Sequence, residues 1–322
     1  MLITPSDIYD SYINIKENIR RTPLEYSPVL SSLSGAQVYL KLDNLQLTGS
    51  FKIRGMMNKI QNINATDFNK PFVAASTGNH AAAFGYAAKK YGFKGTLFLP
   101  EKTSKAKIKA LEEYPIEKRF FGRSSMHTEQ RATEYAMEVD GILIHPYNDP
   151  DIIKGQGSIA IEIESDLPDV ETILVPIGGG GLISGIASYF SNKEKIEIIG
   201  CQPHNASEMV DSINSGKIVA PSTLTTIADA TAGGIEKGSI TFDICKKWVK
   251  GYELSSEEEI KIGLALIVKN HHTLIEPACA LAIAPLLRSH KFNGKKVVCV
   301  LTGKKVNVEL LTEILNKYGD HY

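Results

Sequence analysis

Short apolar runs alternate with amphipathic segments along most of the 322 residues. This alternation is typical of β-α units that build a mainly parallel sheet. Each apolar run that we predict as a strand is followed by a helical pattern. The predicted strands are residues 38–42, 72–75, 96–99, 172–175, 196–200 and 296–301. The pattern therefore predicts an α/β protein.

Two helix starts have clear capping signals. Thr4 precedes a proline at the first helical position, and Ser256 is predicted to form a capping box with Glu259. Residues 221–238 are polar and have no clear periodicity, and a glycine pair within them indicates a surface loop. No repeat or long linker is present, so any domain boundary is expected to be crossed by short connections.

Composition narrows the possible partners. Lys plus Arg number 36 and Asp plus Glu also number 36, and this balance indicates neither a nucleic-acid surface nor a polybasic membrane patch. No stretch approaches the roughly 20 apolar residues of a membrane span, and the N-terminus lacks the features of a signal peptide. The four cysteines form no C-x-x-C pair. We therefore expect a cytoplasmic protein with small-molecule partners and, from its length, roughly two domains.

The first candidate for chemistry is a lysine at a predicted helix start. Lys52 follows the aromatic residue Phe51 where a turn enters the helix. A lysine that forms a Schiff base must be held rigidly and kept partly deprotonated by its surroundings. Lysine at such a position is ordinarily a solvated surface residue, so its context must decide between the two interpretations.

The second candidate is a polar segment between an apolar run and an alanine-rich helix, namely Ser76, Thr77, Gly78, Asn79 and His80. Backbone N–H groups at a helix N-terminus form an anion site, which would suit a substrate carboxylate. The competing interpretation is a strand-to-helix turn in which Asn79 supplies the cap and His80 is structural.

The third candidate is a run of four glycines that follows an apolar run and opens a helix: Gly178, Gly179, Gly180 and Gly181. Glycine costs chain entropy, so four in a row favour close backbone approach, and their N–H groups can hold a phosphate. The spacing is not that of G-x-G-x-x-G, and no acidic residue ends the strand at 196–200, which disfavours a dinucleotide site. A phosphate site is favoured over a plain tight turn.

The fourth candidate is Thr302, which follows the last apolar run at the edge where ligands bind in open parallel sheets. An ordinary threonine at a strand end fits the pattern equally well. Glu276 precedes a proline and is interpreted as an acidic residue at a helix start that needs no function.

Taken in order, these sites resemble the β-family (fold type II) of pyridoxal 5'-phosphate (PLP) enzymes, and within it the serine/threonine dehydratase and serine racemase group. Residues 41–46, 155–158 and 226–229 are similar to that group as well. The resemblance implies a tryptophan synthase β-like fold with two open, mostly parallel sheets flanked by helices. It also implies a large PLP-binding domain, residues 1–66 and 145–322, and an inserted small mobile domain, residues 67–144.

The resemblance assigns roles around the cofactor. Lys52 would bind it as a Schiff base, Phe51 would pack near its ring, and Asn79 would hydrogen-bond its phenolic oxygen. The phosphate would be held by Gly178, Gly179, Gly180 and Gly181. Thr302 would face the pyridine nitrogen, where relatives usually have a serine. A neutral hydroxyl cannot keep that nitrogen protonated as an aspartate would, which favours β-elimination over transamination.

The resemblance also assigns roles around the substrate. Its carboxylate would bind the segment Ser76, Thr77, Gly78, Asn79 and His80. Thr77 is the second candidate catalytic residue after Lys52, because it stands where racemases have a serine that works from the opposite face of the cofactor. Dehydratases often have alanine there, and the extra methyl of threonine changes the reach of the hydroxyl.

Three departures from the group bear on the subtype. Relatives often end the fourth motif with Gly-Gly-Asn, but here Lys304 and Lys305 follow the glycine, so an acidic substrate or simple solvent exposure is expected. Gln202 stands where a cation ligand is usually acidic, and although Ala206 and Glu208 could contribute, the loss of a carboxylate weakens such a site. No metal is predicted. The loop at residues 230–238 resembles dehydratases assigned to ectoine breakdown.

The expected activity is the PLP-dependent dehydration and deamination of a 3-hydroxy amino acid, such as L-threonine or L-serine, to a 2-oxo acid and ammonia. The nearest alternative is a racemase of the serine or aspartate type. Other substrates, such as hydroxyaspartate or a hydroxyectoine-derived amino acid, remain open. A non-catalytic ligand sensor and a nicotinamide dehydrogenase are the rivals from other classes. The resemblance further implies a homodimer.

Overall fold

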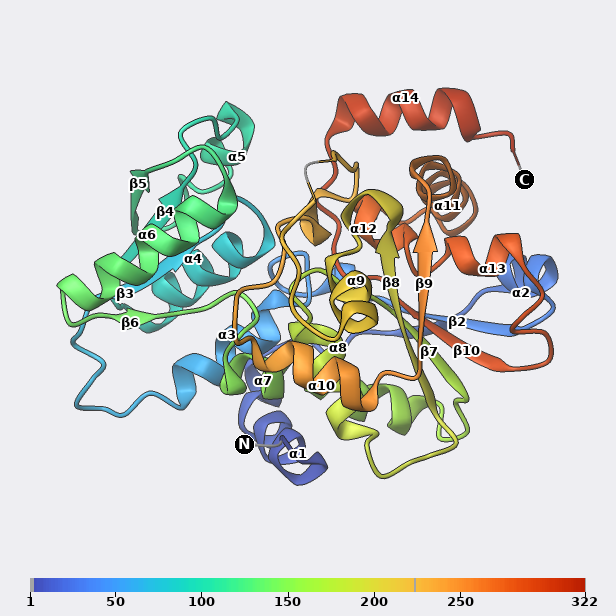
Figure 1. Ribbon diagram of the computed structural model, residues 1–322, viewed down its shortest axis with the longest axis horizontal. Coiled ribbons are helices and arrows are strands. Elements are labelled where there is room, and N and C mark those ends of the chain that lie inside the picture. The colour runs from blue at the N-terminus through green and yellow to red at the C-terminus, as the bar shows by residue number, and fades with distance from the viewer. Residues whose placement is uncertain (1–2, 223, 322) are drawn as a thin grey trace.

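The larger of two sheets has six strands (Figure 1). The protein is described by a computed structural model over residues 3–222 and 224–321. The strand order is β1-β2-β10-β7-β8-β9, in which only β1 and β2 pair antiparallel. The strands are β1 (Leu24–Tyr26), β2 (Gln37–Lys41), β7 (Thr172–Pro176), β8 (Glu197–Pro203), β9 (Gly251–Ser255) and β10 (Lys296–Val300).

Helices cover both faces of the larger sheet because its strands are apolar on both sides. Successive side chains of β10 enter different cores: Val297 and Cys299 pack with one set of helices, and Val298 and Val300 pack with the other. The first set is α2 (Pro28–Ser34), α11 (Glu257–His271), α12 (Pro277–Ala280), α13 (Ala284–Arg288) and α14 (Val308–Tyr318). The second is α7 (Pro150–Asp166), α8 (Gly181–Tyr189), α9 (Glu208–Ser215) and α10 (Ile240–Trp248).

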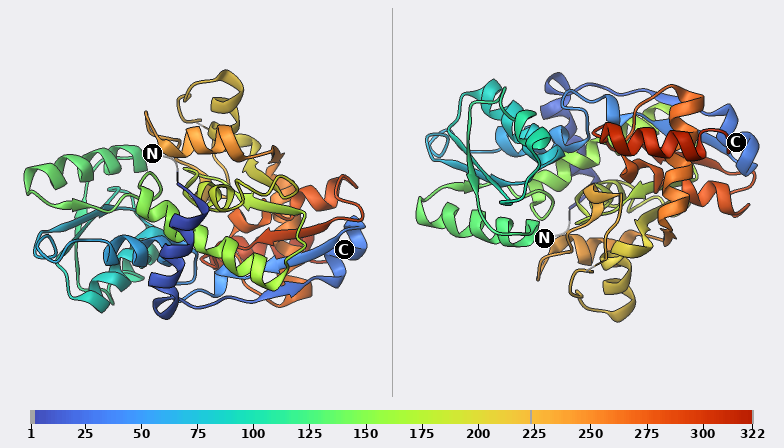
Figure 2. Two further views of the ribbon diagram at one scale, coloured as in Figure 1. Left: turned by 90° about the horizontal axis from the view of Figure 1, so that it is seen from below. Right: turned by 90° about the horizontal axis from the view of Figure 1, so that it is seen from above.

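The smaller sheet is parallel throughout, in the order β5-β4-β3-β6. Its strands are β3 (Phe72–Ala75), β4 (Gly95–Leu99), β5 (Ile116–Phe120) and β6 (Ile142–Leu143). Helices α3 (Lys52–Gln61) and α4 (Asn79–Tyr91) cover one face, and α6 (Ser125–Glu138) covers the other. The short helix α5 (Lys105–Lys109) follows β4, and α1 (Pro5–Ile15) packs on α7. In both views of Figure 2, the smaller sheet and its helices lie to one side of the larger sheet.

The structure confirms the predicted fold class. All six predicted strands are present, and the capping boxes at Thr4 and Ser256 are both formed. All strands of the smaller sheet come from within residues 67–144, while the domain boundary itself and the mobility of that part stay predictions. Residues 221–238, of which residue 223 lies outside the described part, contain only the short 3-10 helix η4 (Asp229–Thr231). Among the described residues, no helix combines the length and hydropathy needed to cross a bilayer.

Candidate active site

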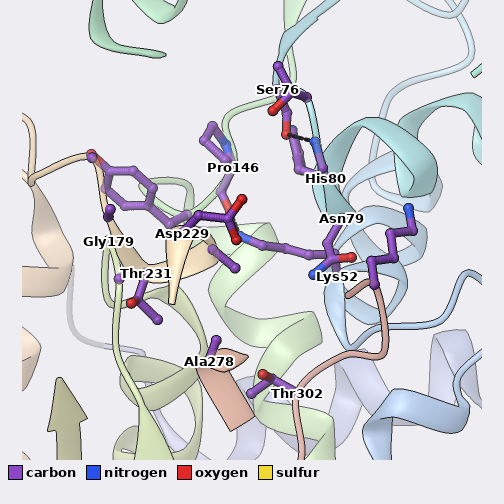
Figure 3. A pocket seen from close by; sticks show the side chains of 18 of the residues that line it. Lys52, Ser76, Asn79, His80, Pro146, Gly179, Asp229, Thr231, Ala278 and Thr302 are labelled. Carbon is purple, nitrogen blue, oxygen red and sulfur yellow. Dashed lines mark hydrogen bonds between the residues drawn. The ribbon is translucent and has the colours of Figure 1, made fainter. Parts of the chain in front are cut away.

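A cavity of about 550 Å³ lies between the two sheets, at the carboxyl ends of their strands. Strand β3 ends just before Ser76, β7 ends two residues before Gly178, and β10 ends two residues before Thr302. Figure 3 shows Lys52 extending between the glycine side of the cavity, marked by Gly179, and the loop that bears Ser76. Every predicted site residue lines this cavity: Phe51, Lys52, Ser76, Thr77, Gly78, Asn79, His80, Gly178, Gly179, Gly180, Gly181 and Thr302.

Lys52 is the first residue of α3, and its amine is held inside the cavity. Its Nζ donates a hydrogen bond of 2.7 Å to the carbonyl oxygen of Pro146 and lies 5.2 Å from the centre of the Phe51 ring. Loss of hydration by burial lowers the pKa of Lys52 to about 8, and the negative charges of Glu129 and Glu276 oppose this shift. The amine can therefore supply a neutral, nucleophilic form near neutral pH.

A fully buried charge network holds the start of α3. The Arg54 guanidinium binds both oxygens of Asp43, at 2.7 and 2.8 Å, and lies 2.7 Å from Oε1 of Glu162. Lys41 lies 2.6 Å from the other oxygen of Glu162. All four side chains are fully buried. Such paired charges are rigid, because a side chain that moves loses partners that water cannot replace in the buried interior. The network therefore holds the first turn of α3, and with it Lys52, in place.

The glycine run forms a wall that other side chains approach closely. A Cβ atom at position 179 would lie 2.4 Å from the Tyr147 ring, and one at position 180 would lie 2.8 Å from Met209. Gly180 also has a left-handed backbone with φ of +88°, which strains any residue with a side chain. The wall ends at the first residue of α8, so backbone N–H groups of a helix N-terminus face the cavity. This geometry suits a phosphate.

The loop from Ser76 to His80 departs from the prediction at one residue. The N-cap of α4 is Gly78, and no side chain caps this helix, so the interpretation of Asn79 as the cap is wrong. The Gly78 N–H instead bonds Oγ of Ser76 at 3.2 Å. Thr77 lines the cavity beside them.

The His80 side chain is buried and turned toward the protein. Its Nε2 lies 2.9 Å from the carbonyl oxygen of Ile144. Burial lowers the pKa of His80 to about 3, and the nearby charge of Lys52 acts in the same direction. The imidazole is therefore neutral and donates its Nε2–H to that carbonyl, which supports a structural role for the side chain.

Glu276 is the main residue whose place the sequence did not reveal. It directly precedes α12, but its side chain makes no capping bond; instead, the carboxylate lies in the cavity and is 3 % exposed. Both carboxylate oxygens accept from Nδ2 of Asn79, at 3.0 and 2.9 Å. Burial raises the pKa of Glu276 to about 7. Glu276 therefore stands at a helix start, as predicted, but its carboxylate also faces the cavity and bonds Asn79, a position that the sequence interpretation did not include.

The end of β10 places one hydroxyl and one lysine at the cavity. Thr302 is buried, and its Oγ1 lies 3.5 Å from Sγ of Cys279. Both lysines are exposed, but Lys305 lines the cavity, whereas Lys304 packs its side chain near Gly49. Of the two lysines noted in the sequence, only Lys305 is in a position to meet a ligand.

Other cavity residues had no recognisable signal in the sequence. Tyr147 packs against the glycine wall and accepts the N–H of Glu236 at 3.0 Å. Lys107, from the part of the chain that forms the smaller sheet, pairs with Asp229 of η4 at 3.1 Å across the cavity. Tyr147 and Lys107 reach the cavity through tertiary contacts between segments up to 122 residues apart. Local sequence patterns could therefore not have identified these two residues as part of the site.

The residues considered for a cation make other contacts. The side chain of Gln202 accepts from the Val210 N–H at 3.1 Å and donates to the Ile177 carbonyl at 3.4 Å, while Glu208 accepts from the Ser222 N–H. Among the described residues, no group of three or more His, Cys, Asp or Glu side chains is arranged to hold a metal.

The comparisons with known proteins agree with this geometry. Residues 15–303 match the model of the pyridoxal-phosphate dependent enzyme family, and the chain belongs to that family. It is 36% identical to an L-threonine ammonia-lyase of Thermotoga maritima, covering 98% of this chain and 79% of that protein. It is 34% identical to the catabolic L-threonine dehydratase of Escherichia coli, over 96% of this chain and 94% of the relative. The structure of maize serine racemase superposes with a TM-score of 0.91 at 27% identity, covering 100% of this chain and 99% of that one.

Proposed function

We propose that the protein is a PLP-dependent ammonia-lyase that dehydrates and deaminates a 3-hydroxy amino acid, such as L-threonine or L-serine. The water lost in the elimination is taken up again when the nitrogen is released by hydrolysis, so the net products are a 2-oxo acid and ammonia. The observation that carries this proposal is the amine of Lys52, held with a depressed pKa in a cavity walled by Gly178–Gly181. The similarity to L-threonine ammonia-lyase over nearly the whole chain supports the same activity.

The residues present fit the cofactor. The glycine wall lets the Tyr147 ring pack where a Cβ atom at position 179 would stand, and it offers N–H groups to a phosphate. The buried Oδ1 of Asn79 has no hydrogen-bond partner among the described residues, as expected of a side chain arranged around a ligand. Phe51 offers an apolar surface beside Lys52. When bound, the cofactor supplies an electron-accepting ring that stabilises negative charge at the substrate Cα.

The residues of the chain then have separate tasks. The backbone of residues 76–80 at the start of α4 would bind and orient the substrate carboxylate. The neutral amine of Lys52 would accept the Cα proton at Nζ, because its surroundings disfavour the charged form. Thr302 would offer a neutral hydroxyl to the ring nitrogen. The His80 side chain is neutral and bonds the Ile144 carbonyl, so it adds no positive charge near the substrate carboxylate.

A second candidate function is racemisation. Thr77 lines the cavity and has a hydroxyl that could exchange a proton with Cα from the face opposite Lys52. The likeness to maize serine racemase supports keeping this alternative. A dehydratase for an acidic substrate such as hydroxyaspartate also remains, and Lys305 at the cavity is the residue that favours it.

Further parts of the proposal concern the whole molecule. Residues 67–144 would move as a small domain relative to residues 1–66 and 145–322, closing the cavity by contacts such as the Lys107–Asp229 pair. The enzyme would work in the cytoplasm as a homodimer; its four cysteine thiols are all buried and unpaired, which suits a reducing compartment.

The test is a Lys52→Ala variant assayed with a panel of amino acids. Ammonia, 2-oxo acid and the D-isomer are measured separately, together with the absorbance of lysine-bound PLP. We expect the variant to lose both the absorbance and all turnover, while Lys304→Ala, outside the cavity, retains both. A Lys52→Ala protein with normal absorbance and rate would refute the proposal, and a D-isomer that forms faster than the 2-oxo acid would favour the racemase.

A further inference from the structure

The contact between Asn79 and Glu276 joins the two parts of the molecule across the cavity. Asn79 is the first residue of α4, on the smaller sheet, and Glu276 directly precedes α12, on the larger one. The amide nitrogen lies nearly midway between the two carboxylate oxygens, at 2.9 and 3.0 Å. Both side chains line the cavity. The pair is therefore part of the surface that a ligand would meet.

The Glu276 carboxylate has little freedom to move. Its backbone N–H bonds the carbonyl oxygen of Gly303 at 2.9 Å. Gly303 also lies against the carboxylate itself, since a Cβ atom there would stand 2.5 Å from Oε1. The side chain is 3 % exposed, so water does not compete strongly for its oxygens. Asn79 therefore meets an acceptor that is fixed in space.

An ionised carboxylate accepts hydrogen bonds and cannot donate them, whereas an amide has a donating end and an accepting end. Glu276 as an anion therefore selects one of the two orientations of the Asn79 amide, the one with NH₂ toward it. The nitrogen has two N–H bonds that diverge. One directed between the two carboxylate oxygens leaves the other available to a second acceptor.

We propose that Glu276 is a positioning residue, which in its ionised form fixes the Asn79 amide so that an N–H group faces the phenolic oxygen of the cofactor. The inference rests on the proposed function, because it takes the cofactor to occupy this cavity. Glu276 touches Asn79 and acts through it. Without this selection, Asn79 could turn its carbonyl oxygen toward an anionic phenolate, and the two acceptors would repel each other.

The charges around Glu276 make the selection depend on pH. Burial raises the pKa of this carboxyl to about 7; the Asn79 hydrogen bonds lower it, Asp229 of η4 raises it, and Lys305 and Lys52 lower it. A protonated Glu276 could donate to Oδ1 of Asn79, which has no hydrogen-bond partner within the described part of the chain. The orientation would then be lost as the pH falls below about 7.

The experiment measures binding of pyridoxine 5'-phosphate, which keeps the ring hydroxyl and the phosphate but has an alcohol in place of the aldehyde. It therefore reports on Asn79 without any reaction of Lys52. Dissociation constants are measured at pH 6 and pH 8 for the natural protein and for Glu276→Gln. Glutamine has the same shape and can still bond Asn79, but it can donate as well as accept. The ligand phosphate itself titrates near pH 6 and affects both proteins alike. The readout is therefore the ratio of the two proteins' dissociation constants at each pH.

We expect Glu276→Gln to bind the ligand about tenfold more weakly than the natural protein at pH 8, the cost of about one hydrogen bond, and about equally at pH 6. In an Asn79→Ala background, Glu276→Gln should have no further effect at either pH. Glu129→Gln changes another carboxylate of the cavity. For this variant, the dissociation constants at pH 6 and pH 8 should stand in the same ratio to each other as in the natural protein.

Two outcomes overturn the inference alone: equal binding by the natural protein and Glu276→Gln at both pH values, or the same loss from Glu276→Gln whether or not Asn79 is present. A folded natural protein that binds neither pyridoxine 5'-phosphate nor PLP would overturn the proposed function together with the inference. The two failures are therefore distinguishable.

Discussion

The protonation of Lys52 gives a quantitative test of the cavity. With a pKa of about 8 instead of the usual 10.5, roughly a tenth of the amine is neutral at pH 7, against about one part in 3,000 for an ordinary lysine. The cause is loss of hydration at a site where Glu129 and Glu276 offer compensating negative charge. The neutral amine is the form that attacks the cofactor aldehyde.

The assay is the rate at which the apoenzyme captures PLP covalently, followed by absorbance between pH 7 and 10, above the range in which phosphate titrates. The rate should rise about tenfold and level off above about pH 9, because nearly all of the Lys52 amine is then neutral. An ordinary lysine would give a rise of several hundredfold across the same range. Replacing Glu129 with Gln removes a charge that raises the pKa, so the plateau should begin at lower pH. A rate that keeps climbing to pH 10 would refute the reasoning.

Three further predictions use other contacts. Arg54→Met should lower the free energy of unfolding by about 3–5 kcal/mol in urea denaturation, because it leaves the buried Asp43 carboxylate without its charged partner. Arg21→Ala, in an exposed pair, should cost about 1 kcal/mol or less, and equal losses would contradict this. Gly179→Ala should weaken PLP binding at least tenfold in a titration, since its Cβ atom would meet the Tyr147 ring. Lys305→Gln should lower kcat/KM for an acidic hydroxy-amino acid about fivefold and leave L-threonine unchanged, while Lys304→Gln should change neither.

The sequence predicted the central strands and missed those at the edges. Runs such as residues 172–175 and 296–301 are apolar throughout because helices cover both faces of the larger sheet, and this composition is visible locally. The missed strands are shorter or partly exposed: β6 has two residues, and β1 has exposed positions at Glu25 and Tyr26. Their pairing depends on neighbours distant in sequence, which periodicity does not report.

The sequence by itself determined the candidate residues of the site. The loop at residues 76–80, the glycine run and Thr302 each follow an apolar run at a strand end, and Lys52 stands at a helix start. Parallel strands bring such ends together at one edge, so Asn79 and Thr302 reach one cavity, and the packing of α3 places Lys52 there as well. Only the tertiary structure decided their chemistry. Burial lowers the pKa of Lys52, and a carboxylate 197 residues from Asn79 in the chain is its hydrogen-bond partner. Hydration and partner choice are set by packing between distant segments, and a local pattern contains no record of either.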